Sequence, residues 1–311
     1  GSHVVDLLLS FKPREIVVID NLLRGKKENL KCALDVSSLP SSNTKINLII
    51  GDIRDQQLLD DCFSNADYCF HLAALRITRC AENPVEATEV MINGTLNILN
   101  MCVKHKLKKL IFSSTASIYG SADEYPTEEK HHPYNNRTYY GAMKLTNESM
   151  CRSYHDMYGL NYLALRYFNI YGPRMDTEGR YTEVMIRWIK SIQEGKAPTI
   201  FGDGKQSMDF VFVKDVANAN ILALTSSLTN DVFNVASGKE TSLCELADLL
   251  LTAMQSILKP VFIPLPSERN KVEVTRRMAS IKKAEELLKF NSSISLLDGL
   301  KQLISWTKHD C

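Results

Sequence analysis

The sequence of 311 residues predicts an α/β fold, in which a parallel, doubly wound sheet is followed by a smaller mixed α/β domain. Two observations carry this prediction. Short apolar runs such as Glu15–Asp20 and Ile46–Ile50 are typical of strands buried on both faces. Such runs alternate with helical patterns over about 170 residues, as in parallel strands joined by helical crossovers. Because the pattern loosens after Tyr171-Gly-Pro173, we predict a first domain at 1–172 and a second at 173–311, with an approximate boundary across which elements can interleave.

The individual elements follow from apolar periodicity and from turn and capping residues. In the first domain we expect helices at 4–10, from about 55, at 85–104 after Pro84 and around Tyr140, strands at 15–20, 46–50, 68–74, 110–113 and 160–169, and a polar loop at 34–46. In the second domain we expect helices at 182–194, 241–255, 280–289 and 295–307, and strands at 199–202, 208–213 and 231–235.

Composition narrows the class of protein. A hydrophobic share of 44%, a charged share of 23% and a net charge of +1 are ordinary for a globular domain and give no reason to expect nucleic acid or a membrane surface as partner. No apolar run reaches the roughly 20 residues of a membrane helix, and no secretory leader opens the chain, so we expect a cytoplasmic protein. The eight cysteines lack metal-binding spacing and are expected to be reduced thiols. His131-His132 has no third ligand at a suitable spacing, so no metal site is predicted.

The predicted strand ends point to one site. In a parallel sheet ligands bind beyond the carboxyl ends of the strands, so Asp20, Asp52, Ala73-Ala74 and Ser113 to Thr115 should face one crevice. Tyr140 and Lys144 are four residues apart and share one face of a helix. A tyrosine, with an ordinary pKa of about 10, needs a shift of about three units to act as a base near neutral pH, and a neighbouring ammonium favours the anion.

A series of short motifs runs along the chain in a fixed order: Ile19-Asp20-Asn21, Gly51-Asp52-Ile53, His71-Leu-Ala-Ala74, Asn93-Gly-Thr95, Ser113-Ser-Thr115, Tyr140-x3-Lys144, Arg166-Tyr-Phe-Asn169, Tyr171-Gly-Pro-Arg174, Phe201-Gly-Asp-Gly204 and Met208-Asp-Phe-Val-Phe-Val213. With these motifs the sequence resembles the extended short-chain dehydrogenase/reductase family. Within that family it is similar to the NAD-dependent nucleotide-sugar epimerase and dehydratase branch, which includes enzymes of the UDP-glucose 4-epimerase type. Each motif alone is weak, but together they span the chain. The resemblance implies a Rossmann sheet that binds NAD.

The resemblance also implies a set of cofactor-binding residues. They are Gly1, Asp20, Asn21, Asp52, Ile53, Leu72, Ala73, Ala74, Arg76, Ser113, Tyr140, Lys144 and Phe168. Asp20 matches the acid that accepts the adenosine ribose hydroxyls and would repel a 2′-phosphate, which favours NAD over NADP. For Asp20 a turn-capping role is the alternative, for Asp52 a loop-starting role, for the two alanines plain packing, and for Arg76 a solvated side chain.

Thr115, Tyr140 and Lys144 are the catalytic residues that the resemblance implies. Tyr140 would remove a proton from a sugar hydroxyl while hydride passes to NAD, and return of the hydride to the other face of the keto sugar would complete an epimerisation. Dehydrating relatives carry an acid pair after the threonine and decarboxylating ones a glutamate two residues on, whereas this chain has Ala116 and Ser117. Epimerisation at C4 of a UDP-hexose is therefore favoured. A dehydratase, decarboxylase or reductase, and a non-catalytic NAD-sensing or scaffold protein, are the alternatives.

The resemblance extends to the substrate and to assembly. Asn169, Thr199, Phe201 and Arg269 match substrate contacts, together with Thr115. Met208 stands where many relatives have a phosphate-binding arginine. Arg269, Arg276 or Arg277 could replace that charge, and Arg269 is the choice by position; the alternative is that Arg276 and Arg277 are a solvated pair. A homodimer formed through helices at 85–104 and 138–158 is expected from the family.

One departure concerns the start of the chain. The family begins with a strand and a Gly-x-x-Gly-x-x-Gly turn, of which only Gly1 is present here; the alternative is that Gly1-Ser2-His3 is the remnant of an expression tag. We therefore expect a gap in the sheet, a longer parent protein, and weak NAD binding by this 311-residue form.

Overall fold

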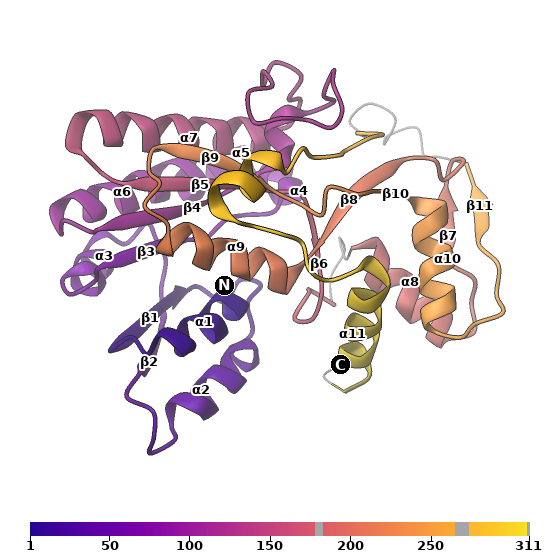
Figure 1. The fold of residues 1–311 in the computed structure, drawn as a ribbon, viewed down its shortest axis with the longest axis horizontal. Coiled ribbons are helices and arrows are strands. Elements are labelled where there is room, and N and C mark those ends of the chain that lie inside the picture. The colour runs from indigo at the N-terminus through magenta and orange to yellow at the C-terminus, as the bar shows by residue number, and fades with distance from the viewer. Residues whose placement is uncertain (178–182, 265–273, 310–311) are drawn as a thin grey trace.

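The computed structural model describes residues 1–177, 183–264 and 274–309. Its main sheet has four parallel strands in the order β3-β4-β5-β9, as predicted for a doubly wound fold (Figure 1). These strands are β3 (Tyr68–His71), β4 (Lys109–Thr115), β5 (Tyr162–Tyr167) and β9 (Asp231–Val235). Because β9 comes from the second half of the chain and pairs with β5, the chain returns to the main sheet after residue 173. The domain prediction allowed for this kind of interleaving.

Helices cover both faces of this sheet because its side chains alternate in direction. Leu110 and Phe112 of β4 pack on one side with helices α3, α6 and α7. Ile111, between them, packs on the other side with α9. All three of these strand side chains are fully buried, and burying each one stabilises the fold by roughly 1.5–3 kcal/mol. The helices around this sheet and the β1-β2 sheet are α1 (Ser2–Leu8), α2 (Lys31–Ser37), α3 (Gln56–Phe63), α4 (Ile77–Glu82), α5 (Pro84–Thr88), α6 (Gly94–Lys104), α7 (Tyr139–Tyr158) and α9 (Val213–Thr225).

Strands β1 (Glu15–Asp20) and β2 (Lys45–Ile50) form a separate two-stranded parallel sheet. Residues of β1 and β3, among them Ile19 and Phe70, line the same cavity of about 2670 Å³. The sheet is therefore divided between β1 and β3, where the sequence predicted a gap.

The predicted elements and the structure differ at three places in the helices and loops that surround the first two sheets. The helix predicted at 85–104 is present, but a π-helical turn, η3 (Glu89–Asn93), lies inside it between α5 and α6. The carbonyl of Met91 in this turn accepts side-chain hydrogen bonds from Thr95 (2.7 Å) and Asn147 (2.9 Å). The polar loop predicted at 34–46 is wrong in its first part, which belongs to α2. Helix α9 was not predicted, because much of its buried face consists of small alanines that give little amphipathic contrast.

The second predicted domain has a hydrophobic core of its own, which includes Trp188, Leu250 and Leu303. A mixed sheet has the order β10-β8-β6, and a pair of parallel strands joins β7 to β11. The strands are β6 (Asn169–Tyr171), β7 (Thr199–Phe201), β8 (Ser207–Phe212), β10 (Glu240–Ser242) and β11 (Val261–Ile263). The helices are α8 (Val184–Gln193), α10 (Leu243–Ala253) and α11 (Leu296–His309). The helix predicted at 280–289 contains a π-helical turn, η5 (Ala284–Leu288). Within the described ranges, no helix combines the length and the apolar character that crossing a bilayer requires.

Candidate active site

Helix α7 brings Tyr140 and Lys144 to the carboxyl end of β4. The helix begins at a cap in which the hydroxyl of Thr138 accepts a hydrogen bond from the backbone N–H of Gly141 at 3.1 Å. Gly141 permits a close approach, since a Cβ there would lie 2.7 Å from the carbonyl oxygen of Ser117. The first turn of α7 therefore packs directly on the 3₁₀ turn Ala116–Tyr119 that follows Thr115.

Lys144 lies beneath this junction and is only 1% exposed. Its Nζ donates a hydrogen bond to the carbonyl oxygen of Ser113 at 2.6 Å and lies 4.8 Å from the centre of the Phe112 ring. Burial lowers the pKa of the ammonium to about 8, because the charged form loses its hydration. Lys144 and Ser113 are therefore in direct contact, as residues of one site would be.

Tyr140 has a raised pKa, contrary to the expectation that its lysine neighbour lowers it. Burial raises the pKa of the phenol to about 12, and a hydrogen bond with the hydroxyl of Thr115 only partly offsets this effect. The ammonium of Lys144 is directed to the carbonyl of Ser113, and it is not among the charges that shift the pKa of Tyr140. The structure thus joins Thr115 to Tyr140, while the phenol remains protonated near neutral pH.

A buried polar network behind this junction was not anticipated from the sequence. Glu148, one turn beyond Lys144 on α7, forms a bidentate ion pair with Arg166 of β5, with distances of 3.0 and 2.7 Å. Glu148 also accepts a hydrogen bond from the hydroxyl of Ser114, the neighbour of Thr115. Arg166 in turn donates to the hydroxyl of Tyr119 at 2.8 Å. The i, i+4 spacing of Lys144 and Glu148 is the sequence signal that could have indicated this network.

The predicted cofactor residues divide into two groups. One group lines the large cavity at the strand ends, and its members are Gly1, Asp20, Asn21, Asp52, Ile53, Leu72, Ala73, Ala74 and Arg76. The other group, outside that lining, is Ser113, Tyr140, Lys144 and Phe168. The strand-end aspartates therefore face one crevice, and the catalytic candidates lie apart from its walls.

The two strand-end aspartates have protein partners. One oxygen of Asp20 accepts a hydrogen bond from the backbone N–H of Leu22 at 2.8 Å, which is the turn geometry given as the alternative for this residue. Asp52 pairs with Arg54, whose Nη2 lies 2.8 Å from its carboxylate, and these hydrogen bonds lower the pKa of Asp52 to about 2. Asn21 also donates to Asp52 at 3.4 Å, which links the ends of β1 and β2.

Arg76 is not a solvated side chain, which corrects the alternative given for it. Its Nη2 lies 3.7 Å from a carboxylate oxygen of Asp176 and 3.7 Å from one of Glu183. Arg24 approaches the same Asp176 at 3.6 Å. Two guanidinium groups and two carboxylates therefore meet at the rim of the cavity, and neither Arg24 nor the two acids was predicted from the sequence.

The predicted substrate residues other than Arg269 lie on three strands, with Thr115 at the end of β4. Asn169 is on β6, and its buried Oδ1 lacks a hydrogen-bond partner among the described residues. Thr199 and Phe201 are on β7, where their carbonyl oxygens accept hydrogen bonds from Trp188 (2.9 Å) and Gln206 (3.0 Å). Arg269 lies outside the described residues.

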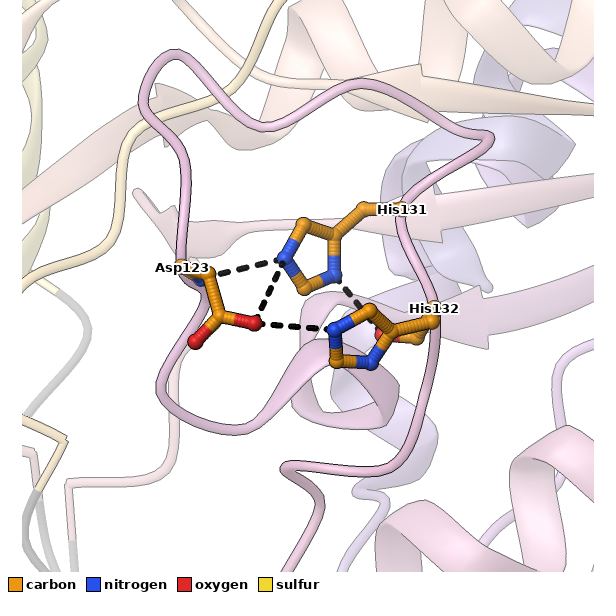
Figure 2. Close-up of side chains that lie close together, drawn as sticks. All are labelled: Asp123, His131 and His132. Carbon is orange, nitrogen blue, oxygen red and sulfur yellow. Dashed lines mark hydrogen bonds and ion pairs between the residues drawn. The ribbon is translucent and has the colours of Figure 1, made fainter.

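Asp123, His131 and His132 meet in the loop between β4 and α7 (Figure 2). Asp123 is a third residue of metal-ligand type that the sequence did not indicate. Hydrogen bonds already occupy all four ring nitrogens: those of His131 meet the backbone N–H of Asp123 and the carbonyl of His132, and those of His132 meet the Asp123 carboxylate and the N–H of Tyr134. The geometry is explained by a hydrogen-bonded loop, and it leaves no ring nitrogen without a partner.

The fold and the strand-end cavity define a dinucleotide-binding α/β protein. The family model described as NAD dependent epimerase/dehydratase family matches residues 1–236. A putative UDP-glucose 4-epimerase of Methanocaldococcus jannaschii is 34% identical, over 100% of this chain and 95% of that protein. A UDP-N-acetyl-alpha-D-glucosaminuronate decarboxylase of Bacillus cytotoxicus is 30% identical, over 98% and 94%. The crystal structure of UDP-glucose 4-epimerase from Thermotoga maritima with UDP-glucose is 32% identical, covers 99% and 95%, and has a TM-score of 0.89. The chain belongs to the NAD dependent epimerase/dehydratase family.

The residues present fit the adenosine half of NAD better than its pyrophosphate. Asp20 at the end of β1 and the small Ala73 and Ala74 after β3 line the cavity, which provides an acceptor and room for a ribose and base. Gly1, which precedes α1, was predicted to belong to the glycine-rich turn, and a Cβ there would meet only Leu72, at 3.9 Å.

Proposed function

We propose that the protein is an NAD-dependent nucleotide-sugar epimerase that acts at C4 of a UDP-hexose. The observation that carries this proposal is the junction of β4 and α7, where Tyr140 and the buried Lys144 lie on one helix and Lys144 contacts the end of β4 that carries Ser113 and Thr115. The 34% identity to a putative UDP-glucose 4-epimerase supports the choice of reaction and of substrate class.

NAD, when bound, supplies the hydride acceptor and donor for the sugar carbon. The residues of this chain move the proton. Tyr140 accepts it from the sugar hydroxyl, and Thr115, already hydrogen-bonded to the phenol, holds that hydroxyl in line. With a pKa of about 12, the phenol needs added positive charge nearby before it can act as a base at neutral pH. Lys144, one turn along the same helix, is charged below its pKa of about 8. Its ammonium is directed to the carbonyl of Ser113 in this structure, so it would have to turn toward the phenol to supply that charge.

A decarboxylase is the second candidate, because a relative with that name is 30% identical. The residues after Thr115 favour epimerisation, since Ala116 and Ser117 are buried and offer no carboxyl group for proton transfer. Glu148 reaches Ser114, but it is held by Arg166 in a bidentate ion pair. Incubation with UDP-glucuronate separates the candidates, because a decarboxylase yields a pentose and an epimerase retains all six carbons.

Replacing Tyr140 by Phe tests the proposed proton transfer. We expect turnover of UDP-glucose to fall by a factor of about 100 to 10,000, because the variant lacks the proton acceptor. Binding of UDP-glucose should be unchanged. The matched control is Tyr139→Phe, since the neighbouring phenol is bonded to Thr88 at 2.6 Å on the surface. Turnover in Tyr140→Phe equal to that of the control would rule out the assignment.

We also propose a cytoplasmic homodimer. The seven described cysteines are all free, as expected in a reducing compartment. The predicted dimer helices now correspond to α6 and α7, which expose Leu96, Met157 and Tyr158, with Met157 67% exposed. Light scattering after gel filtration should give twice the mass of the chain.

A further inference from the structure

The loop between β4 and α7 gathers two imidazoles and a carboxylate at one point (Figure 2). Nε2 of His131 and Nε2 of His132 face the same carboxylate oxygen, Oδ2 of Asp123, at 3.9 and 2.8 Å. One ligand atom from each of the three residues lies within 4.8 Å of the other two. Two ring nitrogens and one carboxylate oxygen form a donor set that suits a three-ligand zinc site.

The hydrogen bonds of His131 fix which ring nitrogen carries the proton. Its Nδ1 lies 2.7 Å from the carbonyl oxygen of His132, and a carbonyl only accepts, so the ring proton is on Nδ1. Nε2 therefore has a lone pair, which accepts a hydrogen bond of 3.0 Å from the backbone N–H of Asp123. This tautomer binds a metal through Nε2, while a backbone carbonyl holds the other ring nitrogen.

The same lone pair shares its space with a negative charge. The amide of Asn135 donates to Oδ1 of Asp123 at 2.9 Å, and this bond, followed by the one from His132, lowers the pKa of Asp123 below its ordinary value. Among the described residues, this carboxylate is contacted by the two imidazoles and the amide, rather than by a lysine or an arginine. A lone pair and a carboxylate that face each other are complementary to a cation between them.

A second contact between histidine and aspartate shows the difference. Nε2 of His105 lies 2.7 Å from Oδ1 of Asp60, and Nζ of Lys104 lies 2.6 Å from the same oxygen. The lysine ammonium already supplies a positive charge to that carboxylate. At Asp123 a second imidazole stands where Asp60 has the ammonium, so the charge at Asp123 is left for a ligand to balance.

His132 reaches the same cation after its ring proton moves. In the structure its Nε2 donates to Asp123, and its Nδ1 accepts a hydrogen bond of 3.3 Å from the backbone N–H of Tyr134. Metal binding at Nε2 transfers the ring proton to Nδ1, so the imidazole stays neutral and the long hydrogen bond from Tyr134 is lost. Because Tyr134 is exposed, water can accept that N–H instead.

Small movements bring the three ligand atoms to one metal. Bonds of about 2.0–2.2 Å in a tetrahedral zinc site place the ligand atoms roughly 3.3–3.6 Å apart. The distances of 2.8 and 3.9 Å to Oδ2 of Asp123 lie on either side of this range. The side chain of His131 is buried, whereas Asp123 and His132 are exposed, so the metal would meet solvent on one side. Water there would complete the coordination.

We infer that Asp123, His131 and His132 bind a divalent cation that prefers nitrogen ligands, with Zn²⁺ as the example. The sequence predicted no metal site, because the histidine pair has no third ligand at a suitable spacing, and it is the path of the loop that supplies Asp123. The inference goes beyond the proposed function and does not depend on it. The cation would hold closed the loop whose end caps α7 through Thr138, and it takes no part in proton or hydride transfer.

Zinc titrations test the site on the chain without an added histidine tag, after treatment with EDTA. By calorimetry the wild type should bind Zn²⁺. The affinity should fall by more than about 100-fold in Asp123→Asn, His131→Gln and His132→Gln, since loss of a partner that only orients a ligand already costs about 10- to 100-fold. Mg²⁺ and Ca²⁺, which prefer oxygen ligands, should not compete. The matched control is His105→Gln, which should bind zinc as the wild type does.

Thermal melting separates loss of the site from loss of the fold. In EDTA, Asp123→Asn should melt close to the wild type, because it changes an exposed side chain and keeps its shape. Zinc should raise the melting temperature of the wild type and of His105→Gln, but not that of the three ligand variants. The inference is overturned if Asp123→Asn and His132→Gln bind zinc as tightly as the wild type, if His105→Gln loses affinity to the same extent, or if the wild type binds no zinc. Turnover is not measured, so failure of the proposed reaction does not affect this result.

Discussion

Single residues of the main sheet show how burial sets protonation. His71, at the end of β3, is 3% exposed, and its Nε2 lies 2.9 Å from the hydroxyl of Thr95. That hydroxyl donates its own proton to the carbonyl of Met91, so Nε2 of His71 is the donor to Thr95. Burial, and secondarily the charge of Lys144, lowers the pKa of His71 to about 3. The imidazole is therefore neutral wherever the fold is intact.

Replacing His71 by Gln should flatten the acid dependence of stability. Between the ordinary pKa of 6.5 and the folded value of about 3, the unfolded chain binds a proton that the native state does not, so stability falls as the pH falls. This one group should lower the free energy of unfolding by about 2 kcal/mol between pH 7 and pH 5. Urea unfolding at pH 7, 6 and 5 measures it. An equally steep loss in the variant would contradict the assignment.

At the scale of elements, the network around Glu148 connects pieces that only the fold brings together. Glu148 of α7 joins Ser114 of β4 to Arg166 of β5, and Tyr119 links Arg166 to Asn234 of β9 at 2.7 Å. The side chains of Arg166 and Glu148 are only 7% and 5% exposed. The network therefore fixes how α7, with Tyr140 and Lys144, lies on the sheet.

Replacing Glu148 by Ala should destabilise the protein by about 3–5 kcal/mol, because it leaves the guanidinium of Arg166 buried without its counter-ion. The double variant Glu148→Leu with Arg166→Leu should lose less than the single one, since neither charge then remains. The control is Asp35→Ala, which breaks an exposed pair with Lys31 at 2.8 Å and should cost well under about 1 kcal/mol. Chemical unfolding at one pH compares the free energies of unfolding of the three variants. A similar loss in Glu148→Ala and in Asp35→Ala would argue against the network.

At the scale of the whole molecule, two of the sheets differ in the number of strands that support them: the four-stranded sheet β3-β4-β5-β9 and the two-stranded sheet β1-β2. Strands β4 and β5 are paired on both sides, whereas β1 and β2 pair only with each other in the described part of the chain. The β1-β2 sheet packs with α1 and α2 in a small hydrophobic cluster, and residues of β1 also border the cavity of about 2670 Å³. A two-stranded sheet depends on such packing for its stability. The two sheets should therefore differ in local stability.

Hydrogen exchange should separate these sheets clearly. Amides of β1 and β2 should exchange at least about tenfold faster than those of β4 and β5, because local opening of a two-stranded sheet disrupts fewer packed contacts. Mass spectrometry of peptic fragments that cover 15–20 and 110–115 provides the comparison. Equal protection of both fragments would show that the divided sheet opens as one unit. Exchange with added NAD would report whether the cavity side of β1 becomes protected.

The sequence by itself determined the elements whose signals are local. The strands at 15–20 and 231–235 were predicted with the bounds that the structure has, because continuous apolar runs and turn residues mark them. The order of the motifs predicted the family. The positions at the strand ends predicted that Asp20, Asp52, Ala73 and Ala74 line one cavity, but Ser113 to Thr115, which were predicted to face the same crevice, lie outside its lining. Spacing alone also placed Tyr140 and Lys144 on one face of a helix.

Only the tertiary structure decided which groups pair and which stay unpaired. The pKa of Tyr140, the π-helical turn at Met91, the ion pair of Glu148 and the contrast between Arg276 and Arg277 all depend on contacts between segments far apart in sequence. Burial and partners set these properties, and neither is a function of local spacing. For this reason the sequence could not distinguish the adjacent Arg276 and Arg277, which it treated as one solvated pair, whereas the fold pairs Arg276 with Glu240 and leaves Nε of Arg277 without a hydrogen-bond partner among the described residues.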